Sequence, residues 1–319
     1  MLSTSGIFSD LDVDVTLDAP IGSMTWYGIG GRADVLLSPH SIEALATLIR
    51  RCRRTRTPLR ILGKGANLLV ADEGVDGVVV RLDAPLFQET RFEEGGEETV
   101  LRAGGGADLA RITVDCARRG LAGFSHMAGI PGTIGGGLRM NAGGAFGCIS
   151  DGVQTVTCLT RTGDVATYSR DELTFDYRRS SLTDPVILGA AFSLSQSDPI
   201  TVRNRVKEIF AFKKSTQPLA EHSAGCAFRN AFDPEHEETI RAGKLIDHAG
   251  LKGLTVGGAR VSDRHANFIT VDGSARADHV LQLMGLVRQR VFEHAGIMLE
   301  NEVVIWRRGD VQEQVKEDS

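Results

Sequence analysis

Two glycine-rich segments carry the residues most able to bind a nucleotide through backbone amides. One is Gly63-Lys-Gly-Ala-Asn67, and the other is AGIPGTIGGGLRMNAGG, from Ala128 to Gly144. The second segment has little side-chain bulk, so its N–H groups can form a concave nest around a diphosphate without a helix dipole. A single such cluster more often permits tight turns. Two clusters in neighbouring α/β units favour cofactor binding.

Three glycine patterns fail as standard nucleotide-binding motifs. Gly28-Ile-Gly-Gly-Arg-Ala33 fits G-x-G-x-x-A, yet the β-like ADVLLSP follows where that motif requires a helix. LRAGGGADLARI lacks the acidic residue that should end the next strand about 20 residues later. LGKGANLLV lacks the first P-loop glycine and a Ser or Thr after Lys64. A Rossmann dinucleotide fold and a nucleotide hydrolase are therefore disfavoured.

Composition narrows the class of protein. The chain has 319 residues and a formal net charge of −5, which suits two or three domains and disfavours a nucleic-acid binder. Its first 18 residues contain neither a basic nor an apolar signal region. No apolar run approaches the roughly 18 residues of a membrane span. We expect a cytoplasmic protein without membrane insertion.

The five cysteines give no framework for a disulfide or for zinc. They are scattered and include no C-x-x-C pair, so four or five of them are expected to be reduced and buried. The histidines show no metal-ligand spacing, and no metal is predicted. Cys226 is treated separately, because its glycine and alanine neighbours in SAGCAFRN favour a loop. The five are Cys52, Cys116, Cys148, Cys158 and Cys226.

Helices and strands alternate along the chain and must position these segments. Residues 1–18 are acidic and aperiodic, which indicates a loosely held arm. Helical periodicity starts near Pro39, and short strands follow it. The same signals predict strands at 99–104, 156–160, 165–169, 186–195 and 302–306, and helices at 107–120, 202–214 and 276–295. The tail after Arg308 is polar.

Eight motifs in order resemble the UDP-N-acetylenolpyruvoylglucosamine reductase family, in its shorter subtype. They run from Thr25 to Val304: TWYGIGGRAD, LGKGANLLV, AGIPGTIGGGLRMNAGG, DYRRS, SAGCAFRN, AGKLIDHAGLKG, GGARVSDRHANFI and ENEVV. The resemblance implies an α+β chain with the FAD-binding fold of the vanillyl-alcohol-oxidase/p-cresol methylhydroxylase type, plus a C-terminal α/β substrate-binding domain. The expected divisions are two FAD-binding subdomains, 1–83 and 84–197, a substrate-binding domain, 198–301, and a returning strand and tail, 302–319.

The resemblance also implies the reaction. UDP-N-acetylglucosamine enolpyruvate would be reduced to UDP-N-acetylmuramate with FAD and NADPH, in peptidoglycan synthesis, and hence in cell wall biogenesis, cell shape and cell division. Residues 129–147 contain no histidine, which favours non-covalent FAD. Two alternatives remain open: another flavin oxidoreductase of this fold, or a degenerate nucleotide-sugar-binding protein.

The family's FAD contacts map onto both glycine-rich segments. The expected residues are Gly63, Lys64, Gly65, Ala66, Asn67, Leu68, Gly129, Ile130, Pro131, Gly132, Thr133, Gly135, Gly136, Asn141 and Gly143.

Three residues match the family's catalytic positions. Arg178 matches an arginine that can grip a carboxylate in bidentate fashion. Glu302 matches a glutamate that is useful when protonated or shared with arginine, and Glu300 is its rival. Cys226 stands where the family usually has a serine as proton donor. A thiol, with a pKa of about 8.5, is the stronger acid, so the role can survive.

The remaining matches concern the diphosphate and uridine of the substrate. The expected substrate-binding residues are Tyr177, Lys213, Lys214, Asn230 and His265. Two further departures from the family pattern are Ala231 in place of proline and Phe146 in place of tyrosine.

Overall fold

The computed structural model describes residues 4–95, 98–233 and 237–310, and the chain contacts divide it into two compact units. Unit 1 comprises Met1–Asp18, Asp34–Lys64 and Gly77–Phe212, and unit 2 comprises Ala19–Ala33, Gly65–Asp76 and Lys213–Ser319. The polar tail from 311 lies outside the described residues. The domain boundaries expected from the sequence remain predictions.

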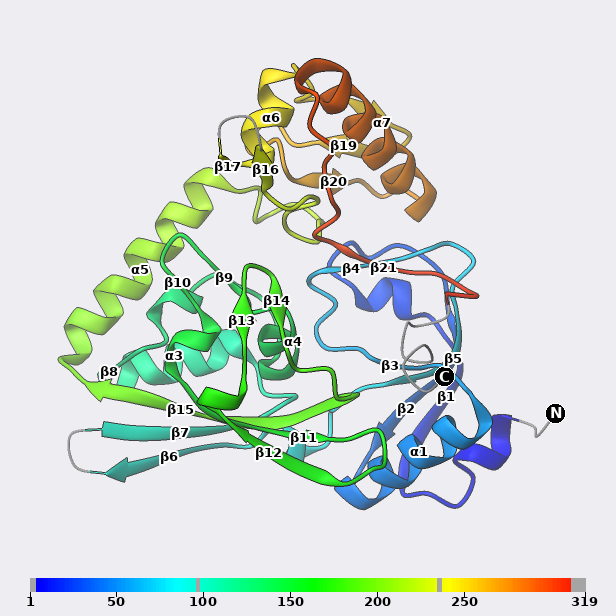
Figure 1. The fold of residues 1–319 in the computed structure, drawn as a ribbon, viewed down its shortest axis with the longest axis vertical. Coiled ribbons are helices and arrows are strands. Elements are labelled where there is room, and N and C mark those ends of the chain that lie inside the picture. The colour runs from blue at the N-terminus through cyan, green and yellow to red at the C-terminus, as the bar shows by residue number, and fades with distance from the viewer. Residues whose placement is uncertain (1–3, 96–97, 234–236, 311–319) are drawn as a thin grey trace. The chain divides into compact units, whose positions relative to one another are not determined.

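The first sheet of unit 1 has four strands in the order β1-β2-β5-β3, with α1 (Ile42–Thr55) beside it (Figure 1). Its strands are β1 (Val13–Ala19), β2 (Ala33–Pro39), β3 (Leu59–Ile61) and β5 (Val75–Val80). The Ser41 hydroxyl caps α1 by accepting the Ala44 N–H at 3.1 Å. The helix ends at Arg56, in the left-handed conformation, before Pro58. The predicted helix and the β-like reading of ADVLLSP are confirmed.

The prediction of a loosely held arm at residues 1–18 is wrong. Val13–Ala19 forms the edge strand β1, and Ile7 and Phe8 are buried in the same core as α1. Most of β1 is exposed, so its acidic residues face solvent at a sheet edge and leave little hydrophobic periodicity to detect.

His40 holds the start of this edge strand. Its two ring nitrogens bond Asp12 at 2.9 Å and Asp14 at 3.0 Å, and these bonds, first that of Asp14, raise the pKa of His40. The stabilisation is therefore present below the unfolded pKa of about 6.5 and is lost as pH rises through the folded value. We expect His40→Gln to lower the Tm near pH 6 and to leave it unchanged near pH 9. An equal loss at both pH values would contradict this.

The second sheet of unit 1 is antiparallel, in the order β12-β11-β15-β7-β6, with β8 also paired to β15. Helices α3 and α4 lie on one side of it (Figure 1). The predicted strands and the helix ending at Gly120 (φ +71°) are confirmed. The elements are β6 (Thr90–Gly95), β7 (Glu98–Gly104), α3 (Leu109–Arg119), β8 (Leu121–Ala122), α4 (Ile134–Arg139), β11 (Val153–Leu159), β12 (Val165–Ser169) and β15 (Val186–Gln196).

Smaller elements complete unit 1 and lead out of it. They are α2 (Pro85–Gln88), the hairpins β9 (Gly143–Gly144) with β10 (Gly147–Cys148) and β13 (Phe175–Asp176) with β14 (Arg179–Ser180), and the basic helix α5 (Pro199–Thr216). The predicted basic helix is confirmed.

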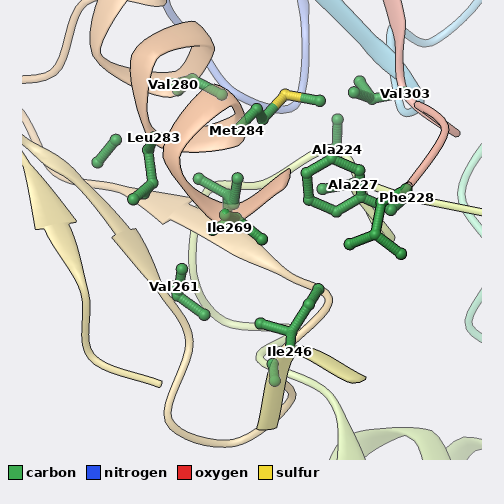
Figure 2. Packing of buried hydrophobic residues seen from close by; sticks show 14 of the residues in the cluster. Ala224, Ala227, Phe228, Ile246, Val261, Ile269, Val280, Leu283, Met284 and Val303 are labelled. Atoms are coloured by element: carbon green, nitrogen blue, oxygen red, sulfur yellow. The ribbon is translucent and has the colours of Figure 1, made fainter. Parts of the chain in front are cut away.

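Unit 2 packs α6 (Ala242–His248) and α7 (Ala277–Ala295) with the sheet β18-β19-β20. Figure 2 shows its apolar core, in which Ala224, Ala227 and Phe228 lie near Val303. The last strand pairs in parallel with β4, as Val304 lies opposite Leu68. The strands are β4 (Leu68–Val70), β16 (Ala231–Asp233), β17 (Glu238–Ile240), β18 (Thr255–Val256), β19 (Ala259–Val261), β20 (Ile269–Val271) and β21 (Val304–Trp306).

The cysteines are less uniformly buried than predicted. Cys52, Cys116 and Cys158 are buried, and because burial disfavours the thiolate the pKa of each is raised to about 12. Cys148 and Cys226 are only half-buried. The expectation of four or five buried thiols is therefore wrong by at least one. Within the described chain, no helix is long and apolar enough to cross a membrane.

Candidate functional site

Gly63 and Lys64, the part of the first glycine-rich segment that belongs to unit 1, lie beside the second segment. A Cβ at Gly63 would lie 2.9 Å from Thr133 Oγ1, so the chains approach too closely for a larger residue. Lys64 forms an ion pair with Asp108, and Asp108 in turn lies opposite Thr133 in an isolated antiparallel bridge. Burial raises the pKa of Asp108, but the Lys64 and α3 amide hydrogen bonds outweigh it and leave the pKa below its usual value. The two segments, which the sequence analysis grouped because both are rich in glycine, are therefore neighbours in space at Gly63 and Lys64.

Four backbone N–H groups in these segments have no acceptor among the described residues. Those of Gly63, Lys64, Gly129 and Gly132 make no hydrogen bond to other described residues. Gly132 has φ +154°, a backbone conformation that favours glycine. Such amides and glycine-only backbone suit an anionic ligand.

The second segment contains a short helix that was not predicted. In α4, Thr133 is the N-cap, and its Oγ1 accepts the Gly136 N–H at 3.2 Å. A run of three glycines disfavours helix, which hid the element. Tertiary packing overrides that propensity, because Ile134 and Leu138 are fully buried. Residues Ile134–Arg139 of this segment are therefore helical.

Arg178 lies in the two-residue turn of the β13–β14 hairpin, also in unit 1. Its φ is +56°, and its Nη1 donates to Gly143 O at 3.0 Å. The guanidinium also lies 5.3 Å from the ring centroid of Tyr177, which is 51% exposed. The hairpin therefore presents a half-buried cation against the end of the glycine-rich segment.

Cys226 lies in unit 2, in an extended segment that Asn267 fixes. The segment pairs with Phe268 through an isolated bridge at Cys226, and Ala227 N–H donates to Asn267 O at 2.8 Å. The Asn267 side chain accepts the Phe228 N–H at 3.0 Å and donates to Phe228 O at 2.8 Å. Asn267 is 3% exposed. Sequence reasoning missed it, since a single Asn inside a motif carries no signal of its own.

Glu302 is hydrogen-bonded through its backbone to the segment that contains Cys226. Its N–H donates to Ala227 O at 2.9 Å, directly after Cys226, and Asn67 Nδ2 donates to Glu302 O at 3.2 Å. Glu302 is 7% exposed, whereas Glu300 is exposed. The choice between the two glutamates remains a prediction.

We expect Asn267→Asp to destabilise unit 2. The substitution removes the donor to Phe228 O and sets a carboxylate against that carbonyl, which should cost about 2–4 kcal/mol in free energy of unfolding. Urea unfolding measures the loss. Asn204→Asp, an exposed change in α5, is the matched control. Equal stability of both variants would show that the clamp is dispensable.

Two expected substrate residues meet at the first turn of α6. Asn230 Oδ1 accepts the Ala242 N–H at 3.2 Å, and a Cβ at Gly243 would lie 3.2 Å from His265 Cε1. His265 Nδ1 accepts the Asn267 N–H at 3.3 Å, and burial lowers the pKa of His265. The neutral ring then carries its proton on Nε2, as a hydrogen-bond donor.

The two lysines at the end of α5 differ in environment. Lys213 is 7% exposed, whereas Lys214 is exposed, and its carbonyl accepts from Arg264 at 3.0 Å. Two further positions differ from the family's usual sequence. Ala231 is the first residue of β16, and the Phe146 ring packs edge-on against the Phe212 ring, with 5.3 Å between the ring centroids.

The described residues fit a flavin dinucleotide. The amides around Gly63 and Gly132 can take the diphosphate. Asn141, 5% exposed, has an Oδ1 that accepts no hydrogen bond from the described residues. A buried acceptor of this kind calls for a donor on a ligand or a water.

Comparisons with known proteins agree. Residues 217–306 match the family described as UDP-N-acetylenolpyruvoylglucosamine reductase, C-terminal domain, and residues 33–169 match the FAD binding domain family. The reductase of Desulfosudis oleivorans is 39% identical over 301 residues, covering 91% of this chain and 94% of its own. That of Syntrophus aciditrophicus is 40% identical over 294 residues, covering 91% of each.

A solved structure extends the agreement to the fold. The reductase of Thermus caldophilus is 36% identical, with a TM-score of 0.74, and the match covers 92% of this chain and 98% of that one. The FAD-binding fold with a C-terminal substrate-binding domain, expected from the sequence, is confirmed. By motif, domain and fold, the chain belongs to the UDP-N-acetylenolpyruvoylglucosamine reductase family.

Proposed function

We propose that this chain reduces UDP-N-acetylglucosamine enolpyruvate to UDP-N-acetylmuramate, with NADPH as co-substrate and FAD as non-covalent cofactor. The observation that carries the proposal is the pairing of the Cys226 segment with Glu302, in a chain whose relatives are named for this reaction. Such an activity would serve peptidoglycan precursor synthesis in the cytoplasm, and through it cell shape and division.

The cofactor would be held by the two glycine-rich segments, through the amides of Gly63, Lys64, Gly129 and Gly132. When bound, FAD supplies the hydride chemistry that links NADPH to the enolpyruvyl group. The chain's own residues must hold the substrate, stabilise the charge that develops on it, and deliver a proton.

Arg178 is proposed to grip the substrate carboxylate. After hydride reaches the methylene carbon, negative charge builds toward that carboxylate, and a bidentate guanidinium gains strength as it does so. Its bond to Gly143 O holds the guanidinium in one orientation.

Glu302 and Cys226 are proposed to serve the other end of the reaction. Glu302 in its protonated form, or sharing its charge with an arginine, would stabilise the enolate. The Cys226 thiol would give its proton to the carbon next to the carboxylate. For the uridine diphosphate, Lys213, Lys214 and Tyr177 offer charge and a ring, and Asn230 and His265 offer hydrogen bonds at α6.

The absorbance spectrum of the purified protein tests the function. The protein should be yellow, bleach slowly with NADPH alone, and recover its colour when the enolpyruvate substrate is added. NADPH consumption that matches substrate reduction excludes another flavin oxidase. Ligand binding without turnover would instead identify a degenerate nucleotide-sugar-binding protein.

Arg178→Ala and Glu302→Gln are expected to act on the transition state. Each meets charge that appears only after hydride transfer, so kcat should fall about 10²–10³-fold while KM changes far less. Reduction of FAD by NADPH should keep its parental rate, as measured by stopped flow. Glu300→Gln, an exposed neighbour, is the control. A parallel collapse of the NADPH step would contradict the assigned roles.

A further inference from the structure

The hairpin that carries Arg178 belongs to neither large sheet of unit 1. Its strands β13 and β14 have two residues each and, among the described residues, pair only with each other. An isolated hairpin of this kind is at best marginally stable in water. Its turn is also strained, because Arg178 has φ +56°. The position of the guanidinium must therefore be set by contacts outside the hairpin.

Arg139, the last residue of α4, provides such contacts on the strand that leaves the turn. Ser180 Oγ, in β14, donates to Arg139 O at 3.0 Å. The guanidinium of Arg139 donates to Leu182 O and to Asp184 O. One guanidinium can serve two carbonyls because its N–H groups form a rigid planar fork. Arg139 thus binds the chain at three points directly after the Arg178 turn.

Both sides of this contact are anchored in the core of unit 1. Leu138, next to Arg139 in α4, is fully buried. On the other side, the Asp184 carboxylate accepts the hydroxyl of Tyr168, in β12, at 2.7 Å. The chain that leaves the hairpin is therefore held between α4 and the antiparallel sheet.

We propose that Arg139 is a positioning residue for Arg178, and that it acts through Ser180 and through the two carbonyls that follow. This rests on the proposed function, in which Arg178 grips the substrate carboxylate. A misplacement of about 1 Å in a group that meets the transition state can cost about 10²-fold in rate. The hold on β14 therefore bears directly on turnover.

Arg139→Lys tests the guanidinium. An ammonium keeps the charge but lacks the planar fork. We expect kcat to fall about ten- to a hundredfold, with little change in KM. In the Arg178→Ala background the same substitution should cost less than about twofold, because the group that it positions is gone. An equal loss in both backgrounds overturns the positioning role.

The FAD content of the same variant separates positioning from cofactor binding. Absorbance of purified Arg139→Lys should show the parental ratio of flavin to protein, and stopped flow should show the parental rate of FAD reduction by NADPH. A loss of flavin in this variant would place the effect of Arg139 on the cofactor and overturn the inference.

Ser180 variants test the hydrogen bond to the Arg139 carbonyl, and they decide the matter if Arg139→Lys fails to fold. Ser180→Ala should lower kcat about three- to tenfold, the size of one hydrogen bond, and Ser180→Thr, which keeps a hydroxyl, should restore it. Ser193→Ala, which removes a serine hydroxyl bond to Glu98 elsewhere in unit 1, is the matched control and should turn over as the parent does. Parental turnover in Ser180→Ala, or a threonine variant no better than the alanine variant, overturns the inference.

Failure of the inference and failure of the proposed function are distinguishable. If the parent does not oxidise NADPH in the presence of the enolpyruvate substrate, the proposed function is wrong and the inference falls with it. If the parent and Arg178→Ala differ as proposed while Arg139→Lys and Ser180→Ala turn over as the parent does, only the inference is wrong.

Discussion

Cys226→Ala is expected to bind FAD and substrate as the parent does and to lose about 10²–10⁴-fold in turnover, the range for a positioned general acid. The half-buried thiol lies in a segment fixed by Asn267 on one side and Glu302 on the other, so its placement does not depend on the thiol itself. The first half-reaction, with NADPH, should be unaffected. Steady-state rates measure the overall turnover, and stopped-flow rates on the same preparation measure the half-reaction with NADPH.

Cys226→Ser is the matched control. A hydroxyl restores the usual family arrangement, so substantial turnover should remain. Iodoacetamide should inactivate the parent slowly and leave the serine variant active. If Cys226→Ala turns over within a few-fold of the parent, the thiol only packs, and water or another residue supplies the proton.

Gly136→Val should abolish FAD retention and all activity that depends on it. Among the described residues, and apart from the backbone of α4 itself, Thr133 Oγ1 at 3.4 Å is the one atom within 4 Å of a Cβ at this position, so the fold leaves room for a side chain where the proposed FAD would bind. The yellow colour should be lost on gel filtration while the thermal unfolding of the protein stays near that of the apoprotein. Gly135→Val is a poorer test, because its Cβ would lie 3.1 Å from Gly105 O.

Gly285→Val provides the control for helix propensity. Gly285 also lies within a helix, α7 of unit 2, and no described atom outside the backbone of that helix lies within 4 Å of its Cβ position. Both substitutions replace a helical glycine by valine, so their effects on helix propensity are comparable. A normal flavin spectrum in Gly136→Val would remove α4 from the cofactor site.

The sequence predicted most of the elements because local signals marked their ends. Ser41 and Gly120 delimit helices as caps and stops should, and ADVLLSP reads as a strand. It failed where packing outweighs propensity, as at the glycines of α4, and where an edge strand buries little, as at β1. Both units also draw on segments far apart in the chain, which no local signal reports.

The site residues could be predicted only from their positions in the family's sequence motifs. The family resemblance supplies Arg178, Cys226 and Glu302, but not the residues that hold them. Asn267 and Asn67 act through side-chain bonds to main-chain atoms distant in sequence. Such contacts leave no periodicity and no spacing to read.

The pairing of β4 with β21 has a consequence for synthesis. These strands, Leu68–Val70 and Val304–Trp306, lie near opposite ends of the polypeptide, and unit 2 also contains Ala19–Ala33. During translation the early strand must wait for almost the whole chain to leave the ribosome. A product truncated before Val304 leaves the backbone of β4 without its partner there. Formation of this strand pair is therefore coupled to synthesis of the chain as far as Trp306.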